Sequence, residues 1–401
     1  MTIGVLAFVV ALLLSIMLHE AGHFVFARAF GMKATQFFLG FGPTLWSFRR
    51  GETEYGVKAI PAGGFVKIVG MTSLEEVAPA DEKRAFYRQP APQRAVVLAA
   101  GSVVHFVIGF LLLLAVFSAI GTPVTTTTIA EVSPCVPATV NDRCNPGDPA
   151  SPAAAAGLRA GDRILAIDGR PVQDWTSFSR DVRAHGAGPV SLGVERDGRR
   201  QTLTPVVVTA SRPSLDDPTR TQTVGVLGIA PGQQRQRLSL PAGLGRSGAL
   251  FGDSLTGTFT ALGKIPAAVP KLLSLDSKRT ADSSPASVVG VARLSGEAIG
   301  AEADLASRIS FFLLIIASLN IFVGIFNLLP LLPLDGGHLA VLGFEQARAG
   351  LYRLLRRPAP NRVDLTKLLP AAYLVIALFV GLSVLLLLAD IINPISNPFT
   401  G

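Results

Sequence analysis

Two histidines and a glutamate lie within one apolar stretch near the start of the chain. His19, Glu20 and His23 form a His-Glu-x-x-His motif inside an apolar run from Ile3 to about Phe30. On a helix, residues four apart project from one face, so both imidazoles can bind one Zn²⁺ ion, with Glu20 as general base. Ionisable groups are costly in a membrane span and need a function or a partner. The motif therefore favours a metal site; the alternative is a pair of hydrogen-bonded histidines at a helix interface.

A catalytic zinc ion needs a third protein ligand and an open position for water or substrate. Asp335 follows Pro330 and Pro333 at the end of another apolar run, and Gly336 and Gly337 come directly after it. Prolines interrupt a helix, and glycines allow the backbone to approach closely. An acid at the point where a membrane segment unwinds suits a metal ligand or a pathway residue. Asp335 is therefore the candidate third ligand.

The composition is typical of a membrane protein. Of the 401 residues, 49% are hydrophobic and 16% are charged, and the mean hydropathy is +0.46. Four segments are long and apolar enough to span a bilayer, namely 3–30, 95–120, 309–334 and 368–392. Residues 1–15 contain no Lys or Arg, so the first segment is expected to be a retained span and not a signal peptide. The formal charge is +8, and much of the basic charge lies close to the ends of apolar segments, so no nucleic-acid partner is expected.

The basic residues predict the orientation in the membrane. Segment 31–94 holds nine Lys or Arg residues, and a second basic cluster lies within 348–367. By the positive-inside rule both connections are cytoplasmic. Both termini and the region 121–308 are then expected outside.

The two halves of the candidate site are expected at a similar depth. His19 lies 16 residues past Ile3, or about 24 Å along a helix, near the inner side of a hydrocarbon core about 30 Å thick. Asp335 lies 26 residues past Ile309, and the proline break can hold it back near the inner face. Because the first and third spans run in the same direction, the two half-sites can meet.

The connections between the spans differ in character. Residues 44–50 and 54–60 predict a β-hairpin. This hairpin either caps the helix bundle or offers an edge on which an extended peptide adds as a strand. Residues 121–150 are rich in Thr and Pro and predict a linker, and 236–308 predict an amphipathic or interfacial helix plus linker.

From about Pro152 the pattern becomes that of a globular domain. Turn and strand signals surround a short predicted helix at Trp175–His185. Cys135 and Cys144, the only cysteines, lie just before this part. They form a disulfide if the region is extracytoplasmic, or remain two free thiols.

Several motifs together carry a resemblance that covers essentially the whole chain. They are the His19–His23 motif, the Gly40–Pro43 turn, the Lys58–Lys67 loop, the Gly157–Leu165 pattern of a PDZ domain, and Asn-Leu-Leu-Pro at 327–330 followed by Leu-Asp-Gly-Gly at 334–337. The sequence resembles the site-2 protease family of intramembrane zinc metalloproteases, and it is most similar to the RseP-like and actinobacterial Rip-like branch.

The resemblance implies one Zn²⁺ ion per chain. His19, His23 and Asp335 would hold it, and Glu20 would be the catalytic base. Asn327 matches a position that holds the substrate backbone or assists at the oxyanion.

Two further histidines are candidates for supporting the site. His105 stands where related proteases often carry Asn in a Gly-Pro-x-x-Asn-Phe motif. It is expected to form hydrogen bonds beside the site and not to be a ligand. His338 either supports the ligands or is simply a residue at a helix N-terminus.

The expected fold is a polytopic α-helical membrane protein with four spans, a membrane-associated β-hairpin or sheet, and one extracytoplasmic PDZ-like domain. The predicted parts, in order, are the first span with the histidine motif (1–30), a cytoplasmic-side hairpin or re-entrant loop (31–94), the second span (95–120), an extracytoplasmic linker and PDZ-like domain (121–235), the amphipathic and linker region (236–308), the third span with Leu-Asp-Gly-Gly (309–338), a cytoplasmic connection (339–367), and the fourth span with the C-terminal tail (368–401).

The expected activity is site-2 cleavage of single-span membrane regulators, such as anti-sigma factors, within a bacterial inner (cytoplasmic) membrane. By resemblance, a site-1 protease first shortens the substrate, and the second cut releases a cytoplasmic fragment. The PDZ-like domain binds a peptide or ectodomain, or only filters by size. One alternative is a non-hydrolytic metal-binding transporter or scaffold with a PDZ adaptor. Another is a zincin that acts on soluble extracellular proteins.

Overall fold

The chain folds into two compact units. The computed structural model describes residues 2–71, 76–137, 144, 148–215, 220–272, 286–301, 303–358 and 362–395, with the side chains of 265–272 and 365 left aside. The first unit combines Met1–Ile120 with Arg237–Gly401, and the second is Gly121–Gln236. Each unit is described by itself.

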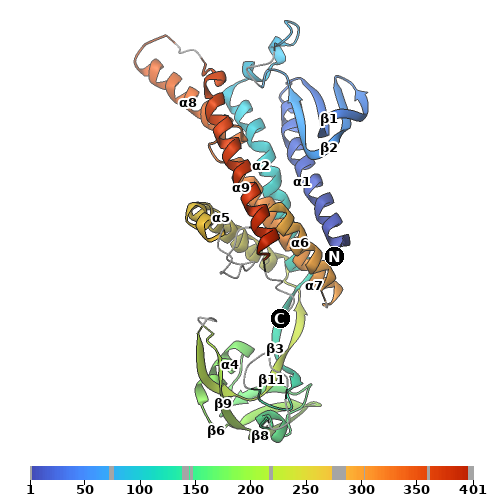
Figure 1. Ribbon diagram of the computed structural model, residues 1–401, viewed down its shortest axis with the longest axis vertical. Helices are drawn as coiled ribbons and strands as arrows, with labels where there is room; N and C mark the ends of the chain where they lie inside the picture. The colour runs from blue at the N-terminus through green and yellow to red at the C-terminus, as the bar shows by residue number, and fades with distance from the viewer. Residues whose placement is uncertain are drawn as a thin grey trace. The chain divides into compact units, whose positions relative to one another are not determined.

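Four helices of the first unit are long and apolar enough to cross a membrane, which confirms that part of the predicted fold. They are α1 (Thr2–Ala29), α2 (Ala91–Leu114) continued by the π-helical turn η3 (Ala115–Ile120), α7 (Leu305–Asn327), and α9 (Leu369–Ile392) preceded by the 3₁₀ turn η4 (Leu365–Leu368). Helix α2 packs against both α1 and α7, and so lies at the centre of the bundle (Figure 1).

The third span is shorter than the predicted 309–334. Helix α7 ends at Asn327, and α8 (Asp335–Leu354) begins after a turn. Pro330 and Pro333 within this turn cannot continue a helix. The turn folds back tightly on the start of α8, because a Cβ on Gly336 would lie 2.2 Å from the carbonyl carbon of Leu328. Only glycine permits this approach, which places Asp335 at the first residue of a new helix.

Strands β1 (Ala34–Arg50) and β2 (Thr53–Ile68) form an antiparallel sheet between α1 and α2 in the chain. The predicted hairpin at 44–60 is present, but β1 begins ten residues earlier than expected. The strands fold back on each other, so that Phe37 is opposite both Val66 and Tyr55. Two short 3₁₀ turns, η1 (Glu82–Arg84) and η2 (Phe86–Arg88), lead from the sheet to α2.

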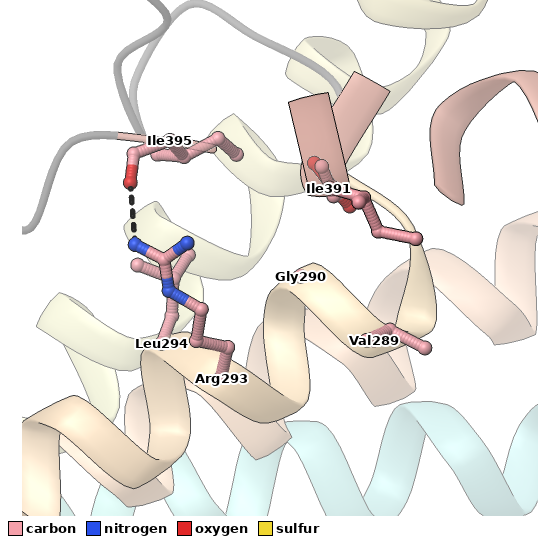
Figure 2. Close-up of a pocket in the computed structure, with 7 residues that line it drawn as sticks. Val289, Gly290, Arg293, Leu294, Ile391 and Ile395 are labelled. Carbon is pink, nitrogen blue, oxygen red and sulfur yellow. Dashed lines mark hydrogen bonds between the residues drawn. The ribbon is translucent and has the colours of Figure 1, made fainter. Parts of the chain in front are cut away.

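Region 236–308 contains two helices, α5 (Leu240–Leu272) and α6 (Val288–Gly300), where one helix and a linker were predicted. Residues 273–285 of that linker lie outside the described part. Ser287 begins α6, and its main-chain N–H donates to Oδ2 of Asp390 near the end of α9, at 2.7 Å. Arg293 Nη2 donates to the Ile395 carbonyl at 3.2 Å, across a small pocket between the two helices (Figure 2). These two bonds tie the end of α9 to α6.

The second unit contains β3 (Thr122–Val132), α3 (Pro152–Ala155), β4 (Arg163–Ile167), β5 (Arg170–Pro171), α4 (Trp175–His185), β6 (Gly188–Pro189), β7 (Leu192–Arg196), β8 (Arg199–Leu203), β9 (Val206–Pro213), β10 (Thr221–Val226) and β11 (Ile229–Gln236). One sheet has the order β11-β3-β4-β7-β8, with β5 paired to β4, and the other has the order β10-β9-β6. Buried Ile129, Ile164, Leu192 and Phe178 form its core.

The prediction of a linker over 121–150 is wrong for 122–132, which form β3. The threonines in that stretch are β-branched and favour an extended chain, so the run fits a strand as well as a linker. Cys135 and Cys144 form a disulfide that closes a short loop just after β3. The PDZ-like character of this unit stays a prediction.

Candidate metal centre

Three side chains from distant parts of the first unit meet in one cluster. His19 and His23 project from the same face of α1, and Asp335 begins α8. The His19 and His23 Nε2 atoms are 3.1 Å apart, and each lies 3.3 Å from Asp335 Oδ2. The two histidines are only 7% and 3% exposed. The structure thus brings together the three ligands predicted from the sequence.

The spacing of these atoms fits a metal ion. Zinc–nitrogen and zinc–oxygen bonds of about 2.0–2.1 Å at tetrahedral angles hold ligand atoms about 3.3 Å apart. The three separations of 3.1, 3.3 and 3.3 Å are close to that value. Within the described residues, Asp335 Oδ2 is buried and accepts no hydrogen bond, which would be costly for an anion without a cation nearby. His19, His23 and Asp335 therefore form a cluster that can bind a metal ion.

Glu20 is held beside the cluster by the sheet. Its Oε2 accepts a hydrogen bond from the main-chain N–H of Val66 in β2 at 3.1 Å. Strand β2 can approach α1 this closely because residue 64 is glycine: a Cβ there would lie 2.7 Å from Met17 Sδ. Strand β2 consequently positions the carboxylate of Glu20, which the sequence predicts to be the general base.

Helix α2 covers the other side of the two histidines. His23 Nδ1 donates to the Val97 carbonyl at 2.7 Å, which leaves the lone pair of Nε2 directed at the cluster. Gly101 lies against the His19 ring, since a Cβ on it would be 2.4 Å from Cε1 and 2.6 Å from Nδ1 and Nε2. On α1, Gly22 packs equally closely on Ala100, whose carbonyl oxygen would be 2.9 Å from an added Cβ. These two glycines let α1 and α2 touch at the level of the two clustered histidines.

His105, Asn320 and Ser15 form a buried, hydrogen-bonded group next to the cluster. Of these three residues, only His105 was identified from the sequence. His105 Nδ1 lies 2.8 Å from Asn320 Oδ1 in α7, and Asn320 Nδ2 donates to Ser15 Oγ at 3.2 Å. The His105 and His19 rings are 4.9 Å apart between centroids. For this group the sequence offered only Ser15 and Asn320 themselves, two of several polar residues within the apolar runs.

Two other predicted residues lie at element ends. Asn327 is the last residue of α7; it is half-buried, and in the described part of the chain it makes no side-chain hydrogen bond. His338 lies in the first turn of α8, three residues after Asp335. Burial lowers the pKa of His338 and outweighs the opposing effect of the Asp335 charge.

Comparison with known proteins agrees with this arrangement. The sequence model of peptidase family M50 matches residues 7–362, a range that includes all three clustered residues and Glu20. The chain belongs to peptidase family M50. This M50 peptidase is 37% identical to zinc metalloprotease Rip1 of Mycolicibacterium smegmatis over 409 residues, which cover 98% of each chain.

Two further relatives extend the comparison. Rip1 of Mycobacterium tuberculosis is 36% identical over 408 residues, again 98% of both chains. Metalloprotease MmpA of Caulobacter vibrioides is 29% identical over 376 residues, which are 86% of this chain and 87% of the relative. The M50 peptidase is thus a zinc metalloprotease with a cluster that can bind a metal ion, in a unit with four membrane-length helices.

Proposed function

We propose that this M50 peptidase is an intramembrane endopeptidase that performs site-2 cleavage of single-span membrane proteins. One observation carries the proposal. The His19–His23–Asp335 cluster is built from the apolar helix α1 and from the residue that opens α8 after the apolar helix α7. A protease site built on one membrane-length helix and on the residue that follows the turn after another would act on peptide bonds at the level of the bilayer.

The residues of the cluster would act in the following way. His19, His23 and Asp335 would hold one Zn²⁺ ion, which when bound supplies Lewis-acid polarisation of water and of the scissile carbonyl. Glu20, oriented by Val66, would take the proton of the attacking water and pass it to the leaving amine. Asn327 would donate its amide N–H to the substrate backbone or to the developing oxyanion.

The sheet supports a role in presenting the substrate. A peptide bond within a helix is shielded by its own hydrogen bonds and side chains, so the substrate must become extended before it is cut. Strand β2 brings main-chain groups to Glu20 through Val66. Of the two predicted roles for the hairpin, we propose an edge on which an extended peptide adds as a strand, because that would place the peptide beside Glu20.

The proposed orientation follows the basic residues. Segment 31–94 and the 348–367 cluster would be cytoplasmic, with both termini and the region 121–308 outside. The Cys135–Cys144 disulfide supports an oxidising location for the second unit. In this orientation the chain would be a multi-pass protein of the bacterial cytoplasmic membrane.

The proposed substrates are single-span regulators such as anti-sigma factors, which a site-1 protease shortens outside the cell first. The second unit would bind the trimmed peptide or ectodomain as a PDZ-like domain, or exclude untrimmed substrates by size. The second cut would release a cytoplasmic fragment that changes transcription. A non-hydrolytic metal-binding transporter or scaffold would also use buried ligands, but it leaves Glu20 beside the cluster without a role.

Replacing Glu20 with Gln tests the proposal, because it keeps the shape of the side chain and removes the base. Membrane fragments are compared by proteomics in cells that carry Glu20→Gln, the wild type, or the control Glu297→Gln, which changes a half-buried glutamate of α6 paired with Arg293. Fragments of single-span proteins should disappear only in Glu20→Gln, while the zinc content of the purified variant stays that of the wild type. The same fragments in all three strains would refute hydrolysis by this site.

A Lys58→Cys variant tests the orientation. Cys135 and Cys144 pair with each other, so position 58 would carry the only free thiol. An impermeant maleimide should label it only after the cytoplasmic side is opened. Labelling of intact cells from outside would favour a zincin that acts on extracellular proteins.

A further inference from the structure

Within the described residues, His19 Nδ1 lacks the hydrogen-bond partner that metal-binding histidines normally have. An imidazole that binds a metal through Nε2 carries its proton on Nδ1 and almost always donates it to a carbonyl, a carboxylate or another acceptor. His23 follows this rule through the Val97 carbonyl. His19 Nδ1, by contrast, is buried and has no hydrogen-bond partner among the residues that the structure describes. The site therefore contains one buried donor that still needs an acceptor.

The nearest aromatic neighbour of His19 outside the cluster is another imidazole. His105 projects from α2, is 2% exposed, and places its ring centroid 4.9 Å from that of His19 with the planes tilted by 38°. Its Nδ1 is bonded to Asn320. Its Nε2 makes no hydrogen bond within the part of the chain that the structure describes.

The surrounding bonds determine which nitrogen of His105 carries the proton. Asn320 Nδ2 lies 2.8 Å from the Ile316 carbonyl, and a carbonyl only accepts, so the NH₂ group must face it. Asn320 Oδ1 therefore faces His105 Nδ1 at 2.8 Å and can only accept from it. In neutral His105 the proton is consequently on Nδ1, and Nε2 is a bare acceptor.

The donor of His19 and the acceptor of His105 are complementary. We propose that His105 is a positioning residue that accepts the Nδ1 proton of His19, directly or through one water molecule, and that Asn320 and Ser15 hold His105 in the accepting tautomer. The inference rests on the proposed function, in which His19 is a zinc ligand. It gives a functional role to three buried polar residues: His105 is 2% exposed, Asn320 1% and Ser15 6%. Polar groups buried among membrane-length helices are expensive without such a task.

A purely structural role is the competing explanation. The same three side chains join α2, α7 and α1, so they could serve only to hold the helices together. That explanation predicts an effect on melting temperature and none on the affinity for metal. The two roles are thus separated by measuring zinc binding and stability on the same variants.

The experiment uses the full chain in lipid nanodiscs, stripped of metal and titrated with zinc against a fluorescent chelator. His105→Phe keeps an aromatic ring beside His19 but has no acceptor, whereas His105→Gln restores an acceptor. Zinc affinity should fall about 10- to 100-fold in His105→Phe, and His105→Gln should recover most of the loss. The melting temperature of each metal-free variant is the control for packing.

Two results would overturn the proposal: wild-type zinc affinity in His105→Phe, or an equal loss in His105→Phe and His105→Gln. If His105→Phe does not fold, Asn320→Leu tests the same point, because it releases the tautomer without changing any residue that touches His19. Asn320→Leu should lower zinc affinity, and an unchanged affinity would refute the role of the tautomer.

A His19→Ala variant distinguishes failure of this inference from failure of the proposed function. If His19→Ala binds zinc as tightly as the wild type, the proposed metal site is wrong and the inference falls with it. If His19→Ala loses zinc and His105→Phe does not, only the role of His105 is refuted.

Discussion

Gly101→Ala should displace His19, a proposed metal ligand, by adding a single carbon atom. The new Cβ would lie 2.4 Å from Cε1 of His19 and 2.6 Å from both ring nitrogens. Alanine favours a helix over glycine by about 1 kcal/mol, so local propensity alone predicts that the substitution stabilises α2. The contact with the imidazole predicts the opposite effect on the site.

The size of the effect follows from the geometry. Ordinary contact for a Cβ begins at 3.4 Å, so the His19 ring or the α2 backbone must move by about 1 Å. A metal site tolerates ligand distances only within about 0.2 Å, and a misplacement of about 1 Å can cost about 100-fold in rate. We therefore expect zinc affinity and proteolytic rate to fall by about two orders of magnitude.

The assay compares Gly101→Ala with Gly109→Ala on the same helix. A Cβ on Gly109 would lie 2.8 Å from Ile321 Cγ1 and 3.1 Å from the Ala317 carbonyl oxygen, in a packed interface without metal ligands. Gly109→Ala should change the melting temperature but leave zinc affinity intact. Zinc is measured by chelator competition and activity by cleavage of a single-span reporter in liposomes. Wild-type zinc affinity in Gly101→Ala would refute the reasoning.

Two predictions concern the second unit. Burial raises the pKa of Asp162, but hydrogen bonds from Arg196 outweigh this effect and hold the pKa below its usual range. The pair therefore adds to the free energy of unfolding in full above the unfolded-state pKa of about 4. This contribution is lost as the pH falls through the lower, folded-state pKa. Thermal unfolding at pH 7 and pH 3 should show this loss, and Arg196→Gln should reduce it. The Cys135–Cys144 disulfide has a sequence separation of 9 and should contribute on the order of 3 kcal/mol to the free energy of unfolding. An unchanged urea midpoint after replacing both cysteines with serine would contradict this prediction.

The elements that position the ligands were largely readable from the sequence. Length and apolar composition predicted the four membrane-length helices, since only a helix satisfies its own backbone in lipid. Pro330 and Pro333 correctly predicted that the helix of the third span is interrupted before Asp335. The last residue of α7 was not predictable, because Pro330 and Pro333 allow the helix to end at any residue before them.

Residues whose importance depends on a distant partner were not predictable. Ser15 and Asn320 are two of several polar residues in the apolar runs, and nothing local indicates that they meet each other and His105. Strand β1 was predicted too short because Gly40 and Gly42 resemble a turn; in the structure both have positive φ, 88° and 83°, within a strand with irregular register. Strand β3 was missed because a run of threonines fits a linker and a strand equally well.

The distribution of the clustered residues along the chain has a consequence for biosynthesis. His19, Glu20 and His23 are made at the very start of translation, and Asp335 follows more than 300 residues later. At about 5–20 residues per second, a ribosome needs on the order of 15–60 s to cover that interval. A nascent chain would therefore hold two of the three proposed ligands, and the newly made protein would gain peptidase activity only once α7 and α8 have joined the first helices.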